Sequence, residues 1–180
     1  MVSKSNLLKV CLFALIVAVA IFFALRQRTT QPAAIGGRAP DFTLPTLSSR
    51  PITLHDLRKR VVVLNFWATW CPPCVEETPS LEKFAEQLRN QGVIVIGVSV
   101  DQDSAALEKF VSQARLSFPI ARDPDQAVAA RYGTYKFPET YIIDADGRLA
   151  EKVVGPADWQ DPRIISFVEE LSRGLGGGGQ

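Results

Sequence analysis

The feature that most constrains the fold of this chain is a mostly apolar, β-branched run, Val61–Trp67, which is followed closely by Cys71 and Cys74. Such a run is typical of a buried central strand. Beyond the cysteines, residues 75–90 carry apolar side chains at helical spacing, and Pro79 is expected to kink this helix. The sequence therefore predicts that a Cys-x-x-Cys motif joins a buried strand to the N-terminus of a helix.

The segments around this junction predict an α/β domain. Their order, β-α-β-α-β-β-α, indicates a mixed sheet with helices on both faces. Asp161 and Pro162 are typical of an N-cap and a first helical position, so a last helix should begin there. The other expected elements are short strands at 42–47 and 51–54, a buried strand at 93–100, helices at 104–115 and 125–131, and hairpin strands at 140–144 and 149–154.

The N-terminal part of the chain carries an apolar segment of another kind. Residues 10–25 are all apolar, and Leu7 and Leu8 lengthen the run. Sixteen helical residues rise roughly 24 Å, against roughly 30 Å for a hydrocarbon core. These features favour a signal-anchor transmembrane helix within residues 1–28, which would contact membrane lipid. The alternative is a cleaved signal peptide, because residues 18–20 resemble a small-residue cleavage site.

The orientation of this segment is not decided by the charges beside it. Lys4 and Lys9 precede the segment and Arg26 and Arg28 follow it, so the positive-inside rule barely discriminates. A short tail, one span and a large domain nonetheless predict that the domain is exported. The expected order is anchor (1–28), flexible linker (29–38), α/β domain (39–173) and flexible glycine-rich tail (174–180).

Composition excludes two classes of function. Twenty basic and nineteen acidic residues give a net charge of +1, without the basic surface that nucleic-acid-binding proteins carry. A zinc site needs about four ligands. His55 is the one histidine, and the third cysteine, Cys11, lies in the apolar N-terminal segment, where we assign it no role. We therefore expect neither nucleic acid nor a metal at the cysteine pair.

The position of the cysteine pair predicts thiol–disulfide exchange. Unpaired N–H groups and the helix dipole at a helix N-terminus favour an anion, so the first thiol ionises more easily. Cys71, at the exposed end, is the predicted nucleophile. Cys74, one turn further along, is shielded and suited to resolving a mixed disulfide.

Three segments resemble a known family. The run from Phe66 to Cys74 resembles the active site of the thioredoxin superfamily. The segments 39–44 and 136–144 are similar to the TlpA/ResA/DsbE (CcmG) branch of it. The resemblance covers roughly residues 36–172 and implies a thioredoxin fold with an N-terminal β extension. The Pro-Glu-Thr form at Pro138 is more like the DsbE side of that branch.

Membership of this branch would imply a function. Its members are tethered periplasmic or extracytoplasmic reductants, many of which serve c-type cytochrome maturation. The resemblance implies a domain outside a bacterial inner membrane and no cofactor beyond the redox-active disulfide. It also implies two partners. The client is a disulfide-containing protein such as apocytochrome c or its chaperone, and the electron donor is a transmembrane thiol carrier.

The resemblance also assigns roles to individual residues. The bond between Phe137 and Pro138 should be cis and should present the backbone of Phe137 to a substrate. Trp70 and Pro72 should complete the substrate-binding surface. Glu77 should carry the proton of Cys74, with a pKa raised by partial burial.

Neighbouring polar residues have weaker assignments. Asn65 stands where similar cytosolic thioredoxins carry a buried aspartate. Glu76 is expected to be solvated, and Asp101 could supply further acidity near the site.

The pair Pro72 and Pro73 predicts a reducing couple. Neither proline has an N–H, so the first turn offers Cys71 fewer backbone donors than a Gly-Pro pair would. A less stabilised thiolate means a more reducing disulfide. Replacement of Pro72 by histidine should therefore lower the pKa of Cys71 and raise the potential.

Three other functions share some of these sequence features. A peroxiredoxin-type peroxidase requires Pro-x-x-x-Thr-x-x-Cys, whereas counting back from Cys74 gives Cys71 and Trp67, and counting back from Cys71 gives Ala68. A non-catalytic adaptor would have no need for both cysteines beside the Pro138 loop. An exported oxidase or isomerase stays open, because the direction of exchange depends on potential and partner.

Overall fold

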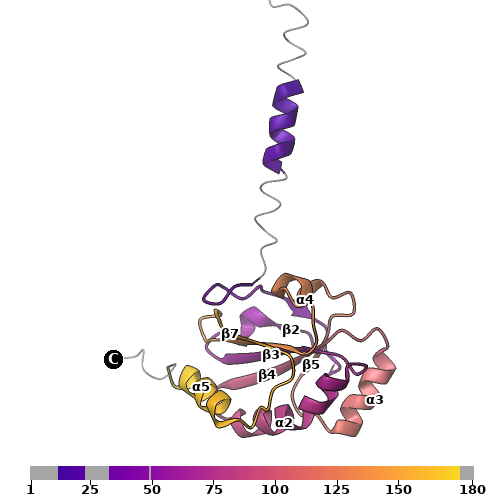
Figure 1. The fold of residues 1–180 in the computed structure, drawn as a ribbon, viewed down its shortest axis with the longest axis vertical. Helices are drawn as coiled ribbons and strands as arrows, with labels where there is room; N and C mark the ends of the chain where they lie inside the picture. Colours follow the sequence, from indigo (N-terminus) through magenta and orange to yellow (C-terminus); the bar gives the residue numbers. More distant parts are fainter. Residues whose placement is uncertain (1–11, 23–32, 49, 175–180) are drawn as a thin grey trace, which may run out of the picture. The chain divides into compact units, whose positions relative to one another are not determined.

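The computed structural model describes residues 12–22, 33–48 and 50–174. The chain divides into two units, the second of which begins at Ala33. In the first unit, residues 12–22 are helical (Figure 1). Among the residues described, no helix has both the length and the apolar character needed to cross a membrane. The rest of the predicted anchor, with Cys11, lies outside the described residues. So do residues 29–32 of the linker and 175–180 of the tail.

The second unit is built on a five-stranded mixed sheet with the strand order β5-β4-β3-β6-β7. The central strand, β3, pairs in parallel with β4 and antiparallel with β6. A separate hairpin of β1 and β2 accompanies this sheet. The strands are β1 (Thr43–Leu44), β2 (Ile52–Thr53), β3 (Val61–Trp67), β4 (Val93–Ser99), β5 (Ile120–Arg122), β6 (Glu139–Ile143) and β7 (Leu149–Val154).

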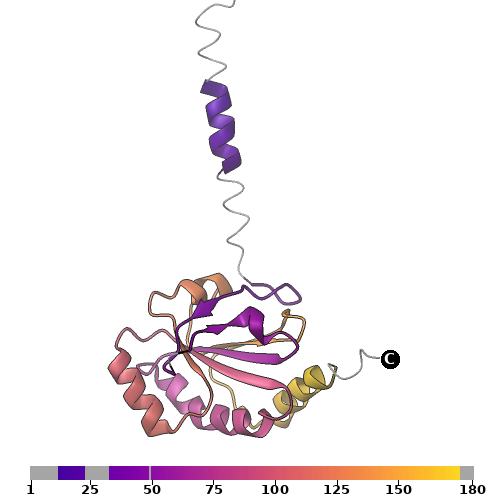
Figure 2. The same ribbon diagram turned by 180° about the vertical axis from the view of Figure 1, so that it is seen from behind.

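Helices cover both faces of the sheet, as the sequence predicts. Figures 1 and 2 show α2, α3 and α5 on one face, with α4 and the β1–β2 hairpin on the other. A short 3-10 helix, η1, follows β2. The helices are η1 (Leu54–Leu57), α2 (Pro72–Leu88), α3 (Ser104–Ala114), α4 (Ala127–Tyr132) and α5 (Pro162–Arg173).

Three details of the predicted elements need correction. Helix α2 begins at Pro72 and not near residue 75, because a proline fits the first helical position, where no N–H is needed. The strands expected at 42–47 and 51–54 are reduced to two residues each, and 54–57 is helical. Strand β5 was not predicted, because its three residues are too short to show a period.

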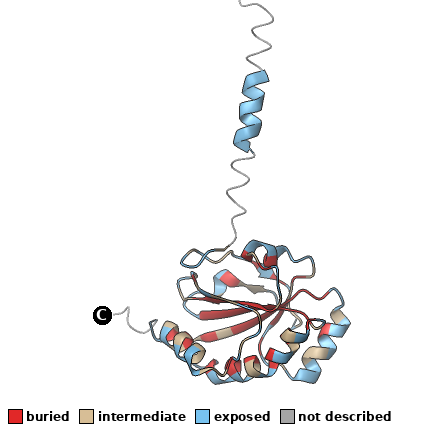
Figure 3. Ribbon diagram, viewed as in Figure 1, coloured by how far each residue is buried: buried red, intermediate tan, exposed pale blue. Residues whose placement is uncertain are grey.

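The core lies on both sides of β3, all of whose residues are buried (Figure 3). On the α4 face, Phe66, Tyr132 and Tyr141 form an aromatic cluster with ring centroids 5.0–5.8 Å apart. On the α2 face, the ring of Trp159 packs 5.4 Å from that of Phe84. The strand that leads to the cysteines is therefore held from both faces.

Residues 33–38, the described part of the predicted linker, are bonded to the rest of the second unit. Gly36 donates its N–H to the carbonyl oxygen of Leu149 at 2.8 Å, and Leu149 donates to Gly37 at 2.9 Å. Arg38 forms an isolated bridge with Arg148. Residues 33–38 are thus tied to the start of β7, and the compact unit begins at Ala33 and not at residue 39.

Candidate active site

The two cysteines lie at the junction of β3 and α2, as predicted. Cys71 is the N-cap of α2, and Cys74 lies in its first turn. They form a disulfide with a Cα–Cα distance of 5.3 Å. Both residues are buried, with 5% of Cys71 and 1% of Cys74 exposed. Cys71 was expected at an exposed end, but in the disulfide form it is buried almost as fully as Cys74.

The first turn of α2 supplies few backbone donors for Cys71. Pro72 and Pro73 have no N–H. The N–H groups of Cys74 and Val75 both donate to the carbonyl oxygen of Cys71, at 3.0 and 3.1 Å. The donors that could stabilise a Cys71 thiolate at other helix N-termini are therefore missing or already used within this turn.

The Phe137–Pro138 loop lies directly beside the disulfide. The bond between these residues is cis, as the family resemblance implied. The carbonyl oxygen of Phe137 is 3.5 Å from the sulfur of Cys71. The Phe137 ring meets the ring of Trp70 edge-on, with centroids 6.1 Å apart, and 62% of Trp70 is exposed. With the exposed Pro72, these residues form one surface around the disulfide.

Glu77 lies in a buried polar site behind Cys74, and only 5% of the residue is exposed. The side chain of Asn65 donates to its Oε1 at 2.8 Å. The N–H of Ala157 and the indole N–H of Trp159 donate to its Oε2 at 3.0 and 3.3 Å. Burial raises the pKa of the Glu77 carboxyl above its ordinary value, and the hydrogen bonds oppose this rise without cancelling it.

Asn65 connects this site to the sheet. Besides its bond to Glu77, its Nδ2 donates to the hydroxyl of Thr140 at 2.9 Å. The sequence pattern marks Asn65 and Glu77 as site residues, but it marks neither Ala157 nor Trp159. These two contacts come from the loop after β7, 80 or more residues away in the chain. No local motif marks that loop as part of the site.

The two neighbouring acidic residues differ from Glu77. Glu76 is exposed, as expected. Asp101 is buried and accepts hydrogen bonds from the N–H and hydroxyl of Thr69 and from the hydroxyl of Ser99. Asp101 therefore fixes the loop between β3 and the cysteines. That gives Asp101 a structural task in the active-site loop.

A second buried glutamate, Glu139, follows the cis proline, and the sequence alone indicates no role for it. Glu139 is fully buried, and its Oε2 lies 3.0 Å from Nζ of Lys152 and 3.2 Å from the hydroxyl of Tyr141. Burial lowers the pKa of Lys152, but hydrogen bonds to Tyr141 and Glu139 outweigh this and leave it raised. The other oxygen of Glu139, Oε1, is buried without a hydrogen-bond partner among the described residues.

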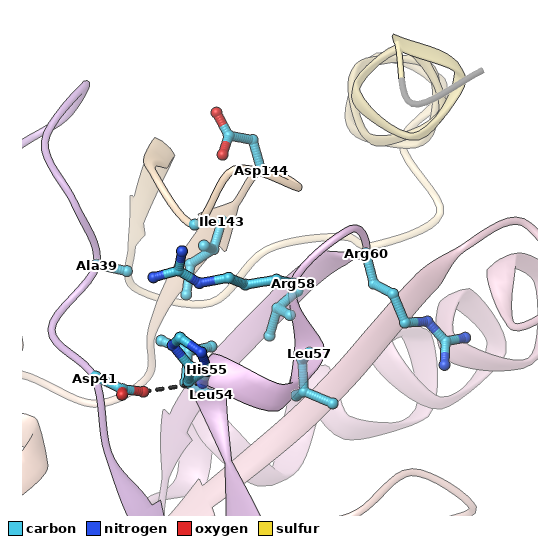
Figure 4. Close-up of a pocket in the computed structure, with 11 residues that line it drawn as sticks. Ala39, Asp41, Leu54, His55, Leu57, Arg58, Arg60, Ile143 and Asp144 are labelled. Atoms are coloured by element: carbon cyan, nitrogen blue, oxygen red, sulfur yellow. Dashed lines mark hydrogen bonds between the residues drawn. The ribbon is translucent and has the colours of Figure 1, made fainter. Parts of the chain in front are cut away.

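A small cavity lies at the opposite end of β3 from the cysteines. Figure 4 shows the residues that line it. Its walls include His55, Arg58 and Asp144, and its volume is about 30 Å³. A cavity of that volume is large enough to hold ordered water. In the part of the chain that the structure describes, no group of three or more ligating side chains could hold a metal ion.

Comparison with known proteins decides the family. A family model described as AhpC/TSA family matches residues 35–152. This chain belongs to the AhpC/TSA family. It is 35% identical to the thiol-disulfide oxidoreductase ResA of Bacillus thuringiensis (strain Al Hakam) over 155 residues, 84% of this chain and 90% of that protein. ResA of Geobacillus thermodenitrificans (strain NG80-2) is 37% identical over 128 residues, 71% of this chain and 74% of that protein.

Solved structures agree with these relatives. A candidate thiol:disulfide interchange protein DsbE from Chlorobium tepidum superposes with a TM-score of 0.69 at 29% identity, covering 81% of this chain and 99% of that chain. The predicted thioredoxin-like fold is thus confirmed. This AhpC/TSA family member is a thiol-disulfide oxidoreductase of the ResA/DsbE type, and Cys71 and Cys74 are its active-site pair.

Proposed function

We propose that this oxidoreductase works as a reductant on the outer side of a bacterial inner membrane. Its clients would be oxidised proteins of c-type cytochrome maturation, such as apocytochrome c or its chaperones. The apolar N-terminal segment would anchor it, and a transmembrane thiol carrier would return electrons to the cysteines. Support comes from the resemblance of its motifs to the TlpA/ResA/DsbE branch and from the geometry of the first turn of α2.

The first turn of α2 offers Cys71 no free backbone N–H, and this observation carries the direction of the reaction. A dithiol oxidises other proteins when its reduced form is strongly stabilised. Here Pro72 and Pro73 offer no N–H, and the next two N–H groups bind the carbonyl oxygen of Cys71. The thiolate therefore gains little stabilisation, which favours transfer of electrons out of the pair.

In the proposed reaction, the thiolate of Cys71 attacks one sulfur of a client disulfide. The client S–S bond breaks, a mixed disulfide forms, and the leaving client thiolate takes up a proton. Cys74 then loses its proton and attacks the sulfur of Cys71. The mixed disulfide breaks, the Cys71–Cys74 disulfide forms, and the second client thiolate is released. Two electrons have then passed to the client.

Glu77 is proposed as the acceptor of the Cys74 proton. It lies one turn after Cys74 on α2, is buried, and has no cationic partner among the described residues. Its raised pKa brings the carboxyl closer to the pKa of a thiol, which makes proton transfer between them less costly. The surface of Trp70, Pro72, Phe137 and Pro138 would hold the client disulfide above Cys71.

The reduction potential of the Cys71–Cys74 pair tests this proposal. A value near or below about −270 mV, that of thioredoxin, would support a reductant. A value above roughly −180 mV would instead assign the protein to the oxidases or isomerases. In addition, Pro72→His should raise the potential, because histidine restores an N–H and adds a side-chain donor beside Cys71. An unchanged or lower potential in this variant would overturn the role of the two prolines.

A further inference from the structure

Tyr135 is an exposed aromatic side chain close to the active site. It lies in the loop between α4 and β6, and 74% of it is exposed, the highest value for a large apolar side chain among the residues described. It stands two residues before Phe137, whose carbonyl oxygen lies 3.5 Å from the sulfur of Cys71. Two residues span at most about 7 Å. A polypeptide bound at the disulfide would therefore pass within reach of Tyr135.

Two ammonium groups lie close to the ring of Tyr135. The Nζ atoms of Lys136 and Lys152 each lie 5.7 Å from its centroid, within the range of a cation–π contact. Lys136 is exposed and has no ion pair among the residues described. Lys152, in contrast, has a side chain that is only 25% exposed. The two cations thus differ in how firmly they are fixed.

Lys152 is fixed by the buried network behind the loop. Its Nζ binds Oε2 of Glu139 at 3.0 Å and the carbonyl oxygen of Gly133 at 3.4 Å. The hydroxyl of Tyr141, which lies next to the same Glu139 oxygen, is 2.7 Å from the carbonyl oxygen of Tyr132. This network therefore ties the start of the loop to its end, and Lys152 extends from it to the exposed ring.

We propose that Tyr135 is a specificity-determining residue that contacts an extended segment of an oxidised polypeptide client, with Lys152 and Glu139 as its positioning residues. The proposal rests on the proposed reduction of protein disulfides. Tyr135 lies in the same loop as Phe137, whose ring contacts the exposed ring of Trp70. Because Lys136 is an unpaired cation beside the ring of Tyr135, the surface favours a client segment that carries acidic side chains next to its disulfide.

Single exposed apolar side chains are common and need no function. The experiment must therefore separate a client contact from an ordinary surface residue. The full-length protein in detergent is assayed with two substrates, glutathione disulfide and an oxidised Cys-x-x-Cys peptide with flanking aspartates. The readout is the ratio of kcat/KM for the peptide to kcat/KM for glutathione disulfide. Ile35→Ala is the matched control, since Ile35 is 56% exposed and lies beside the start of β7.

We expect Tyr135→Ala to lower this ratio about threefold to tenfold, through KM for the peptide, as for the loss of one aromatic contact. Tyr135→Phe should stay within twofold of the parent. Lys152→Met combined with Glu139→Gln removes both members of the ion pair and so leaves no buried charge unpaired. This double variant should show the same fall, and adding Tyr135→Ala to it should lower the ratio no further. Lys152→Arg should restore the parental ratio.

Other outcomes would overturn the inference. If Tyr135→Ala behaves like Ile35→Ala, Tyr135 is not a specificity residue. If the effects of the double variant and of Tyr135→Ala add, Lys152 does not act through Tyr135. A peptide with flanking lysines that is reduced as well as the aspartate peptide would contradict the charge preference. If the parent reduces neither substrate, the proposed function fails. If it reduces both and the ratios stay constant, only the inference about Tyr135 fails.

Discussion

Two buried glutamates lie on opposite faces of the sheet near the disulfide, and they are held in different ways. Glu77, on the α2 face, receives three hydrogen bonds from neutral donors. Glu139, on the face of Phe66 and Tyr141, binds the ammonium group of Lys152. A buried carboxylate is costly unless a cation or several donors compensate it. The burial of Glu139 is thus compensated by a cation, and the burial of Glu77 by the dipoles of neutral groups alone.

This difference separates a structural contact from a group that can exchange a proton. The ion pair with Lys152 makes Glu139 a fixed structural contact. Neutral donors offset only part of the cost of burying a charged carboxylate, so the pKa of Glu77 is raised. A carboxyl with a raised pKa, one turn from Cys74, is suited to accept and return a proton.

The largest effect should come from Glu77→Gln. This variant keeps the shape of the side chain but cannot accept a proton, so resolution of the mixed disulfide by Cys74 should slow by on the order of 100-fold at neutral pH. Stopped-flow tryptophan fluorescence with a trapped mixed disulfide measures this step. Glu76→Gln, the exposed neighbour, is the matched control and should change the rate by less than about twofold. Equal rates in both variants would remove Glu77 from the mechanism.

The second prediction concerns the compensated glutamate. Lys152→Met leaves Glu139 buried without its cation and should lower the free energy of unfolding by about 1.5–3 kcal/mol, since Lys152 is itself partly exposed. Urea denaturation measures this loss. The combined variant Lys152→Met/Glu139→Gln should recover much of the lost stability. If the single and the combined variants are equally stable, the pair is not the structural contact described above.

The two glutamates also differ in how much of their surroundings could be predicted from the sequence. The Val61–Trp67 strand, the cysteine pair and Glu77 belong to one local pattern, so their arrangement could be predicted. The donors to Glu77 from Ala157 and Trp159 could not, because only the tertiary fold brings that loop to α2. The Lys152–Glu139 pair depends on the register of β6 and β7, which shifts between Ile142 and Ile143 and leaves no signal in the sequence.

A third prediction follows from the sign of the Glu77 shift. Below the ordinary value of 4.5, both the folded and unfolded chains hold this proton, so Glu77 has no pH-dependent effect on stability. Above it, the unfolded chain loses the proton first, because the folded pKa is raised, and the folded state loses stability as pH rises. The stability of the parent minus that of Glu77→Gln should therefore fall between pH 4.5 and the raised pKa. Urea titrations over this range measure the difference, and a difference that rises with pH would show that the pKa is lowered.

The smallest effect should come from one of the neutral donors. Trp159→Phe removes the indole N–H that lies 3.3 Å from Oε2 of Glu77 but keeps an aromatic ring against Phe84. Loss of one hydrogen bond should cost about 0.5–1.5 kcal/mol of stability. It should also raise the pKa of Glu77 further, because that donor stabilises the charged form, and so move the pH midpoint of the resolution rate upward. The Glu77→Gln variant has no carboxyl to titrate at this position, so adding Trp159→Phe to it should not shift the pH dependence of the resolution rate. A downward shift in the parent background would mean that the neutral donors do not set the proton affinity of this carboxyl.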